Sequence, residues 1–66
     1  MTEKRVKVYK ALREYVEENG YSPSLKELCD MVDFLDNTNV YHYLRTLKEK
    51  GFINYVKVDD IEIIDL

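Results

Sequence analysis

Two segments with the apolar spacing of a helix are joined by only a short turn, and this arrangement constrains the fold more than any other feature. The first segment spans residues 24–32, where Ser24 and Glu27 have the spacing of an N-terminal capping box. The second spans residues 37–50 and ends at Gly51. The sequence DFLDN makes the turn between them. The residues predicted to face inward are Leu25, Leu28, Cys29 and Val32 in the first segment and Val40, Tyr43, Leu44 and Leu47 in the second.

A further helix precedes this pair and a hairpin follows it. Residues 3–18 carry apolar side chains at helical spacing, and Gly20 is a helix stop because glycine tolerates the left-handed conformation. Residues 52–65 contain two β-branched and aromatic runs, FINYVKV and IEIIDL, joined by Asp59 and Asp60 as a short hairpin turn. Three helices followed by a hairpin is the order of a winged helix-turn-helix domain. The sequence therefore predicts a mainly α fold with a small β-hairpin.

The length and composition favour one folded domain spanning residues 1–66. A chain of 66 residues forms a single core and buries about 60% of the surface that its unfolded form exposes. Apolar residues make up 45% and charged residues 35%, and the chain has only two Gly and one Pro, so it reads as globular rather than disordered. Neither a repeat nor an interdomain linker interrupts the predicted elements.

The net charge of −3 at first argues against contact with nucleic acid, because phosphate binding draws on a basic surface. The charges are segregated along the chain, however. Residues 1–13 carry five Lys or Arg against one Glu, and residues 37–57 carry four against one. Residues 14–36 carry seven acids against one Lys, and residues 58–66 carry four acids. A local basic face is therefore compatible with the acidic total.

The sequence argues against several other classes of protein. Cys29 is the only cysteine and no histidine cluster stands near it, so neither a disulfide scaffold nor a zinc site is expected. We predict that Cys29 is a small buried hydrophobic side chain. No apolar run reaches the roughly 20 residues that span a bilayer, and the start MTEKRVKVYK has no signal segment. With no nucleophile–base pair or phosphate-binding glycine loop, we expect a cytoplasmic protein without catalytic activity, metal, cofactor or membrane association.

The stretch NTNVYHYLR, residues 37–45, places hydrogen-bonding groups on the faces of the third predicted helix that do not face the core. Asn can pair bidentately with adenine and Thr can touch the thymine methyl group, so this chemistry suits direct reading of DNA bases. An alternative is that Asp36 or Asn37 caps the helix and the whole DNTN sequence is only an N-cap cluster. The residues alone leave both interpretations open.

From Gly20 to Ile53 the sequence GYSPSLKELCDMVDFLDNTNVYHYLRTLKEKGFI resembles the N-terminal DNA-binding domain of LexA-type SOS repressors. The residues that match the family's pattern are Gly20, Pro23, Ser24, Glu27, Leu28, Val32, Phe34, Val40, Leu44, Leu47, Lys50, Gly51 and Ile53. The resemblance implies a winged helix-turn-helix that binds double-stranded DNA, with its third helix in the major groove and the hairpin near the DNA backbone. We further expect two copies on a palindromic site to bind more tightly than one.

The resemblance also implies roles for individual residues by position. The residues expected to contact bases are Asn37, Thr38, Asn39, Tyr41 and His42, and those expected to contact phosphates are Ser24, Arg45, Lys48 and Lys50. Asp33 stands where the family favours a Gly in the turn, and Asp is expected to be tolerated because it enters the left-handed region more readily than most residues. Asp36 adds a negative charge at the start of the third helix, where the helix dipole favours negative charge.

Full-length LexA repressors also carry a C-terminal self-cleaving peptidase domain, through which they dimerise. The 66 residues end before such a domain, so neither autoproteolysis nor this means of dimerisation is expected of them. A small transcriptional regulator of cellular or of phage origin agrees equally well with these residues.

A second hypothesis is an acidic protein-interaction module built on the same fold. In that case the acidic segments from Glu14 to Asp36 and from Asp59 to Asp65 would face a basic partner, such as a regulator or a DNA-binding protein. The two hypotheses differ in which surface matters. Reversal of charge at Arg45 would abolish DNA binding and spare the protein partner, whereas reversal of charge at the hairpin acids would do the opposite.

Overall fold

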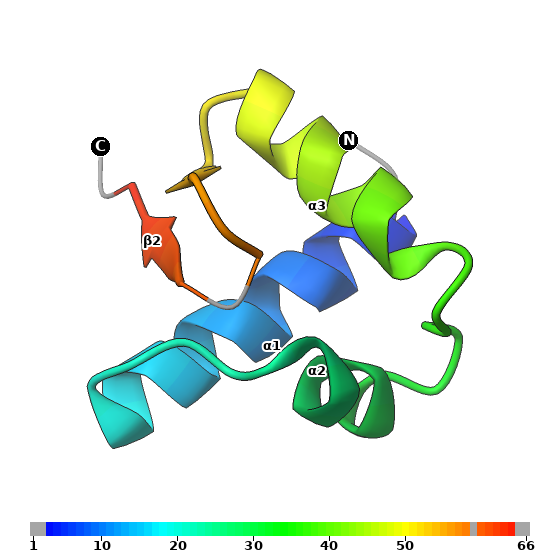
Figure 1. The fold of residues 1–66 in the computed structure, drawn as a ribbon, viewed down its shortest axis with the longest axis horizontal. Helices are drawn as coiled ribbons and strands as arrows, with labels where there is room; N and C mark the ends of the chain where they lie inside the picture. Colours follow the sequence, from blue (N-terminus) through cyan, green and yellow to red (C-terminus); the bar gives the residue numbers. More distant parts are fainter. Residues whose placement is uncertain (1–2, 59, 65–66) are drawn as a thin grey trace.

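The computed structural model describes residues 3–58 and 60–64, which form three helices and a two-stranded antiparallel hairpin (Figure 1). In chain order the elements are α1 (Glu3–Asn19), α2 (Leu25–Met31), α3 (Val40–Glu49), β1 (Ile53–Tyr55) and β2 (Ile61–Ile63). Helix α1 crosses the middle of the view, with α2 on one side of it and α3 and the hairpin on the other (Figure 1). The predicted fold class, a mainly α winged helix-turn-helix, is confirmed.

The core lies where the three helices and the hairpin meet, and every helix and strand contributes to it. The buried hydrophobic residues are Val8, Leu12, Leu28, Val32, Leu35, Val40, Leu44, Leu47, Ile53 and Ile61. Three other residues predicted to face inward, Leu25, Cys29 and Tyr43, are half-buried and pack against this cluster. Burial of one such aliphatic side chain contributes roughly 1.5–3 kcal/mol, so these contacts are the main stabilising term for so short a chain.

Cys29 packs against the core from its edge and is not fully enclosed. Burial raises the pKa of its thiol, and the carboxylates of Asp36 and Asp30 raise it further. A thiol with a raised pKa carries little reactive thiolate at neutral pH. Cys29 therefore behaves as a hydrophobic side chain rather than as a nucleophile.

Glycine ends α1 and α3 in the way the sequence predicted. Gly20 has φ of 77° and Gly51 has φ of 82°, in the left-handed region that closes a helix. Asp33, which was expected to be tolerated in place of a Gly, does not enter this region, because no non-glycine residue among those described has a positive φ. Instead, the N–H of Leu35 donates to the carbonyl of Val32 at 3.0 Å, and a four-residue turn of this kind does not require a positive φ.

The hairpin is shorter than its β-branched sequence suggested, with three residues in each strand. The register pairs Ile53 with Ile63, Asn54 with Glu62 and Tyr55 with Ile61. The connection is longer than the predicted two-residue turn at Asp59 and Asp60, because β1 ends at Tyr55 and β2 begins at Ile61, and the N–H of Asp60 donates to the carbonyl of Lys57 at 3.0 Å. Asp59 itself lies outside the described residues. Two-residue hairpin turns need positive φ and usually contain a glycine, which this loop lacks.

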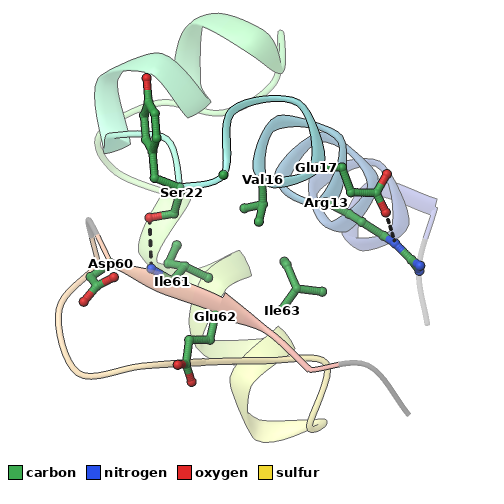
Figure 2. A pocket seen from close by; sticks show the side chains of 10 residues that line it. Arg13, Val16, Glu17, Ser22, Asp60, Ile61, Glu62 and Ile63 are labelled. Atoms are coloured by element: carbon green, nitrogen blue, oxygen red, sulfur yellow. Dashed lines mark hydrogen bonds and ion pairs between the residues drawn. The ribbon is translucent and has the colours of Figure 1, made fainter.

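Two side chains from the helical part hold the hairpin in place. The Oγ of Ser22 accepts a hydrogen bond from the backbone N–H of Ile61 at 3.0 Å, beside a hollow between α1 and β2 (Figure 2). The Nζ of Lys48 in α3 donates to the carbonyl of Tyr55 at 2.7 Å and lies 4.6 Å from the centroid of the Tyr55 ring. The hairpin is therefore fixed to α3 through β1 and to the segment after α1 through β2.

Candidate DNA-binding site

Helix α3 has a buried face and an exposed face. The buried face consists of Val40, Leu44 and Leu47. The exposed row consists of Tyr41, His42 and Arg45 on α3, of which Tyr41 and Arg45 have the i, i+4 spacing of one side of a helix, together with Thr38 in the turn just before α3. Tyr41 is 51% exposed. This side of the helix therefore presents hydroxyl, imidazole and guanidinium groups together.

The turn that leads into α3 is organised by Asp36 and Asn39. The Oδ1 atom of Asp36 accepts hydrogen bonds from the backbone N–H groups of Thr38 and Asn39, each at 2.8 Å. In return, the Oδ1 atom of Asn39 accepts from the backbone N–H of Asp36 at 2.9 Å. This reciprocal pair has the logic of a capping box. It leaves residues 37–39 in a turn, so α3 begins at Val40, later than predicted.

The other end of the Asn39 amide is also engaged, since its Nδ2 atom donates to the carbonyl of Phe34 at 2.9 Å. The ring of Phe34 packs edge-on against Tyr43 with centroids 5.5 Å apart, and Tyr43 contacts His42 at 5.7 Å. The Nζ atom of Lys4, at the start of α1, lies 5.7 Å from the centroid of the Phe34 ring. The turn is therefore connected to α1 on one side and to the exposed row on the other.

The basic residues in and at the end of α3 differ in how far the protein itself engages their side chains. The Nε of Arg45 hydrogen-bonds to Glu49 at 3.3 Å, but both side chains are exposed and such a pair contributes little in water. The Arg45 guanidinium also has further N–H donors. Lys50, at the C-terminal cap of α3, is exposed. Lys48 donates a hydrogen bond to the carbonyl of Tyr55 in the hairpin.

Ser24 caps α2 as its spacing from Glu27 predicted, because its Oγ accepts from the N–H of Glu27 at 3.2 Å. The carboxylate of Glu27 is the main cause that raises the pKa of the Tyr15 hydroxyl on α1 above its ordinary value, because a neighbouring carboxylate favours the protonated hydroxyl. Burial and the neighbouring Tyr21 raise it further. Glu27 in the first turn of α2 thus influences Tyr15 on α1, while Ser24 stays exposed.

The structure brings four of the five predicted base-contacting residues together on an exposed surface. Asn37 and Thr38 lie in the turn before α3, and Tyr41 and His42 lie in its first half. Asn39 differs, since it is half-buried and both ends of its amide bond to the protein backbone. The contact between Lys4 and Phe34 has no signal in the sequence, because the two residues are far apart in the chain.

Metal ligands do not gather in the part of the chain that the structure describes. Across residues 3–58 and 60–64, no three side chains of His, Cys, Asp or Glu lie where they could hold a metal ion. Within the same residues, no helix has both the length and the apolar surface needed to cross a membrane.

A short turn between two helices, a polar exposed face on the second of them and a hairpin after it define a winged helix-turn-helix DNA-binding domain. The sequence model of the LexA DNA binding domain family matches residues 1–59, and the chain belongs to this family. The resemblance recognised between Gly20 and Ile53 is thereby confirmed. Membership also favours DNA binding over the acidic interaction module.

LexA repressors of several organisms are similar to this chain. That of Desulfatibacillum aliphaticivorans is 37% identical over 57 residues, which cover 86% of this chain and 28% of the relative. That of Acetivibrio thermocellus is 40% identical over 53 residues, covering 80% and 25%. That of Mycobacteroides abscessus is 36% identical over 69 aligned positions, covering 98% and 31%. The chain therefore spans about a quarter to a third of the length of these relatives.

Proposed function

We propose that this chain binds double-stranded DNA sequence-specifically and serves as the DNA-binding part of a transcriptional repressor. The observation that carries the proposal is the exposed row formed by Tyr41, His42 and Arg45 on α3 and by Thr38 in the turn before it, in a chain of the LexA DNA binding domain family. An α-helix fits the major groove, where each base pair presents a distinct pattern of donors and acceptors. The repressor role is supported by the relatives, which are LexA repressors.

The proposed readers of bases are Asn37, Thr38, Tyr41 and His42, all of them exposed. The amide of Asn37 can pair bidentately with adenine, and the methyl group of Thr38 can contact that of thymine. The hydroxyl of Tyr41 and the imidazole of His42 can donate to purine acceptors in the groove. Asn39 is left out of this set because both ends of its amide already bond to the protein backbone.

The proposed phosphate contacts are Ser24, Arg45, Lys48 and Lys50. Arg45 suits this role because its guanidinium is exposed on the same row as the readers and keeps N–H donors beyond the one to Glu49. Lys48 also keeps donors beyond the one that it gives to Tyr55. These contacts would position α3 without carrying sequence information.

The acidity of the chain limits the affinity of one copy for DNA. The carboxylate of Asp36 lies close to the proposed readers, but it accepts two backbone N–H bonds at the start of α3, where the helix dipole favours negative charge. With a net charge of −3, one copy is expected to bind modestly. We expect two copies on a palindrome about one helical turn apart to bind more tightly. The protein is expected to act in the cytoplasm and to need neither a cofactor nor catalytic activity.

The test is a selection from a random pool of fluorescent duplexes with the 66-residue chain, followed by sequencing of the bound fraction. Titrations at about 50 mM and about 200 mM salt then measure the affinity for the selected duplex. We expect one enriched motif and an affinity that falls as salt rises, because phosphate contacts release counterions. A folded sample that enriches no motif at the lower salt concentration would overturn the proposal.

A further inference from the structure

We propose that Asn39 is a positioning residue for DNA reading rather than a reader of bases, a role that rests on the proposed function. Its amide forms a clamp between the backbone of Phe34 and that of Asp36. The Oδ1 atom accepts from the N–H of Asp36 at 2.9 Å, and the Nδ2 atom donates to the carbonyl of Phe34 at 2.9 Å. Only this orientation of the amide satisfies both backbone groups, so the chemistry fixes which end is which.

A reading asparagine needs both ends of its amide directed at the edge of one base. Here both ends are directed at the protein backbone, and the side chain is half-buried. Its neighbours Asn37 and Thr38 are exposed. If Asn39 turned toward DNA, the N–H of Asp36 and the carbonyl of Phe34 would lose the partners that they have in the free protein, which costs binding energy.

The clamp acts on the readers through the backbone. Asp36 accepts from the N–H groups of Thr38 and Asn39, and Asn39 returns a bond to Asp36, so the residues in between have a defined path. Phe34 is itself held by the ring of Tyr43 and lies beneath Lys4. Asn39 thereby connects this anchored turn to the start of α3. Readers held in this way lose less conformational freedom on binding, which favours specific over non-specific contact.

The experiment compares Asn39→Ala with the wild type on three sets of duplexes: the selected sequence, its single-base-pair variants, and a scrambled sequence. We expect Asn39→Ala to bind the selected duplex about tenfold more weakly, in the range that the loss of one or two side-chain hydrogen bonds produces. Discrimination should weaken at all of the positions read, and the affinity for the scrambled duplex should stay within about twofold, because phosphate contacts are not sequence-dependent. Measurements are made at a temperature where both proteins are fully folded.

A matched control is Asn19→Ala. Asn19 also donates an amide hydrogen to a backbone carbonyl, that of Tyr15 at 3.0 Å, but it does so at the end of α1. We expect this variant to bind like the wild type. Loss of discrimination at one base pair alone in Asn39→Ala would make Asn39 a reader and overturn the proposal, as would wild-type binding by Asn39→Ala.

A second measurement uses the wild-type protein and needs no variant. In the absence of DNA, the backbone amide hydrogen of Asp36 should be protected from exchange, and with the selected duplex the side-chain amide of Asn39 should show no nuclear Overhauser contact with base protons. Rapid exchange at Asp36, or such a contact from Asn39, would overturn the clamp. If the wild type selects no motif at all, the proposed function fails and this role fails with it; if the wild type selects one and the Asn39 results are negative, only this inference fails.

Discussion

The turn before α3 and the hairpin after it differ in how far along the chain their longest side-chain hydrogen bond reaches. At the turn, the side chains of Asp36 and Asn39 bond to backbone groups at most 5 residues away. At the hairpin, Ser22 bonds to Ile61, 39 residues away in the chain. Local contacts form with little cost in loop closure, whereas the distant contact needs the helices to be assembled first.

This difference separates the part of the molecule that faces DNA in our proposal from the part that depends on the core. The hairpin reaches the core through Ile53 and Ile61, both buried, while Val56 at its loop is 97% exposed. Changes at the core should therefore affect the hairpin and the whole fold. Changes at the turn should stay local and affect mainly the presentation of the readers.

The largest effect is expected from Ile53→Ala, which removes the hairpin's most buried side chain. Truncation of a buried Ile costs about 2–5 kcal/mol through lost burial and the cavity that remains. A domain of this size has a free energy of unfolding of only about 3–10 kcal/mol, so a large share of it should be lost. Urea unfolding followed by far-UV circular dichroism measures the change.

The control for this prediction is Val56→Ala in the same hairpin, because Val56 is almost fully exposed. It should change the free energy of unfolding by less than about 0.5 kcal/mol. Equal effects of the two substitutions would mean that the hairpin is not anchored through Ile53.

A smaller effect, on DNA rather than on stability, is expected from Arg45→Glu on the exposed row of α3. Loss of a phosphate contact and introduction of a like charge should weaken binding to the selected duplex by roughly tenfold or more and reduce the salt slope by about one or more. Fluorescence anisotropy at several salt concentrations measures both quantities.

In the hairpin, Asp60→Lys should leave binding unchanged or make it slightly tighter, since it removes an exposed negative charge.

Arg13→Glu is a closely matched control. Arg13 pairs with Glu17 four residues along α1 at 3.0 Å, just as Arg45 pairs with Glu49 along α3, so the two substitutions change the same charge and break the same type of ion pair. Arg13 lines the hollow beside β2 instead of the exposed row (Figure 2). If Arg13→Glu weakens DNA binding as much as Arg45→Glu, the effect is one of total charge and the assigned contact is wrong.

A still smaller effect on stability distinguishes the turn before α3 from the hairpin directly. Asp36→Ala removes the acceptor of two N–H groups before α3, and Ser22→Ala removes the acceptor of the Ile61 N–H. Each should lower the free energy of unfolding by about 1 kcal/mol. Hydrogen exchange should lose protection at Thr38 and Asn39 in the first variant and at Ile61 in the second. A variant that disturbs both regions would contradict the separation drawn between them.

The same distinction explains how much of this molecule the sequence predicts. The three helices and the hairpin follow from apolar spacing, from the cap at Ser24 and from the glycines after α1 and α3, all of which are local signals. The start of α3 could not be predicted as well, because Asp36 and Asn37 are both good caps. The cap is neither of them but Asn39, because Asp36 and Asn39 bond to each other's backbone and residues 37–39 stay in a turn.

The candidate site divides in the same way. Periodicity alone identifies the face of α3 that carries Tyr41, His42 and Arg45, because the opposite face is apolar. It does not reveal that Asn39 turns inward to the carbonyl of Phe34, or that Lys48 reaches Tyr55 in the hairpin. Those contacts depend on where the turn and the hairpin lie in space, and residue type gives no information on that.

The smallest effect is on the pH dependence of the free energy of unfolding, and it concerns only α1 and α2. The neighbouring carboxylate of Glu27 raises the pKa of Tyr15, so the folded state holds the hydroxyl proton more tightly than the unfolded state does. Its contribution is therefore fully present below about pH 10, the ordinary pKa of Tyr, and is lost as pH rises through the folded value. The free energy of unfolding in urea should fall less steeply above about pH 10 in Tyr15→Phe than in the wild type, and Glu27→Gln should flatten the curve in the same direction.

Cys29, whose pKa is also raised, is unchanged in all three proteins and does not contribute to the difference. Parallel curves for the wild type and Tyr15→Phe would mean that the interaction of Tyr15 with Glu27 does not contribute to stability.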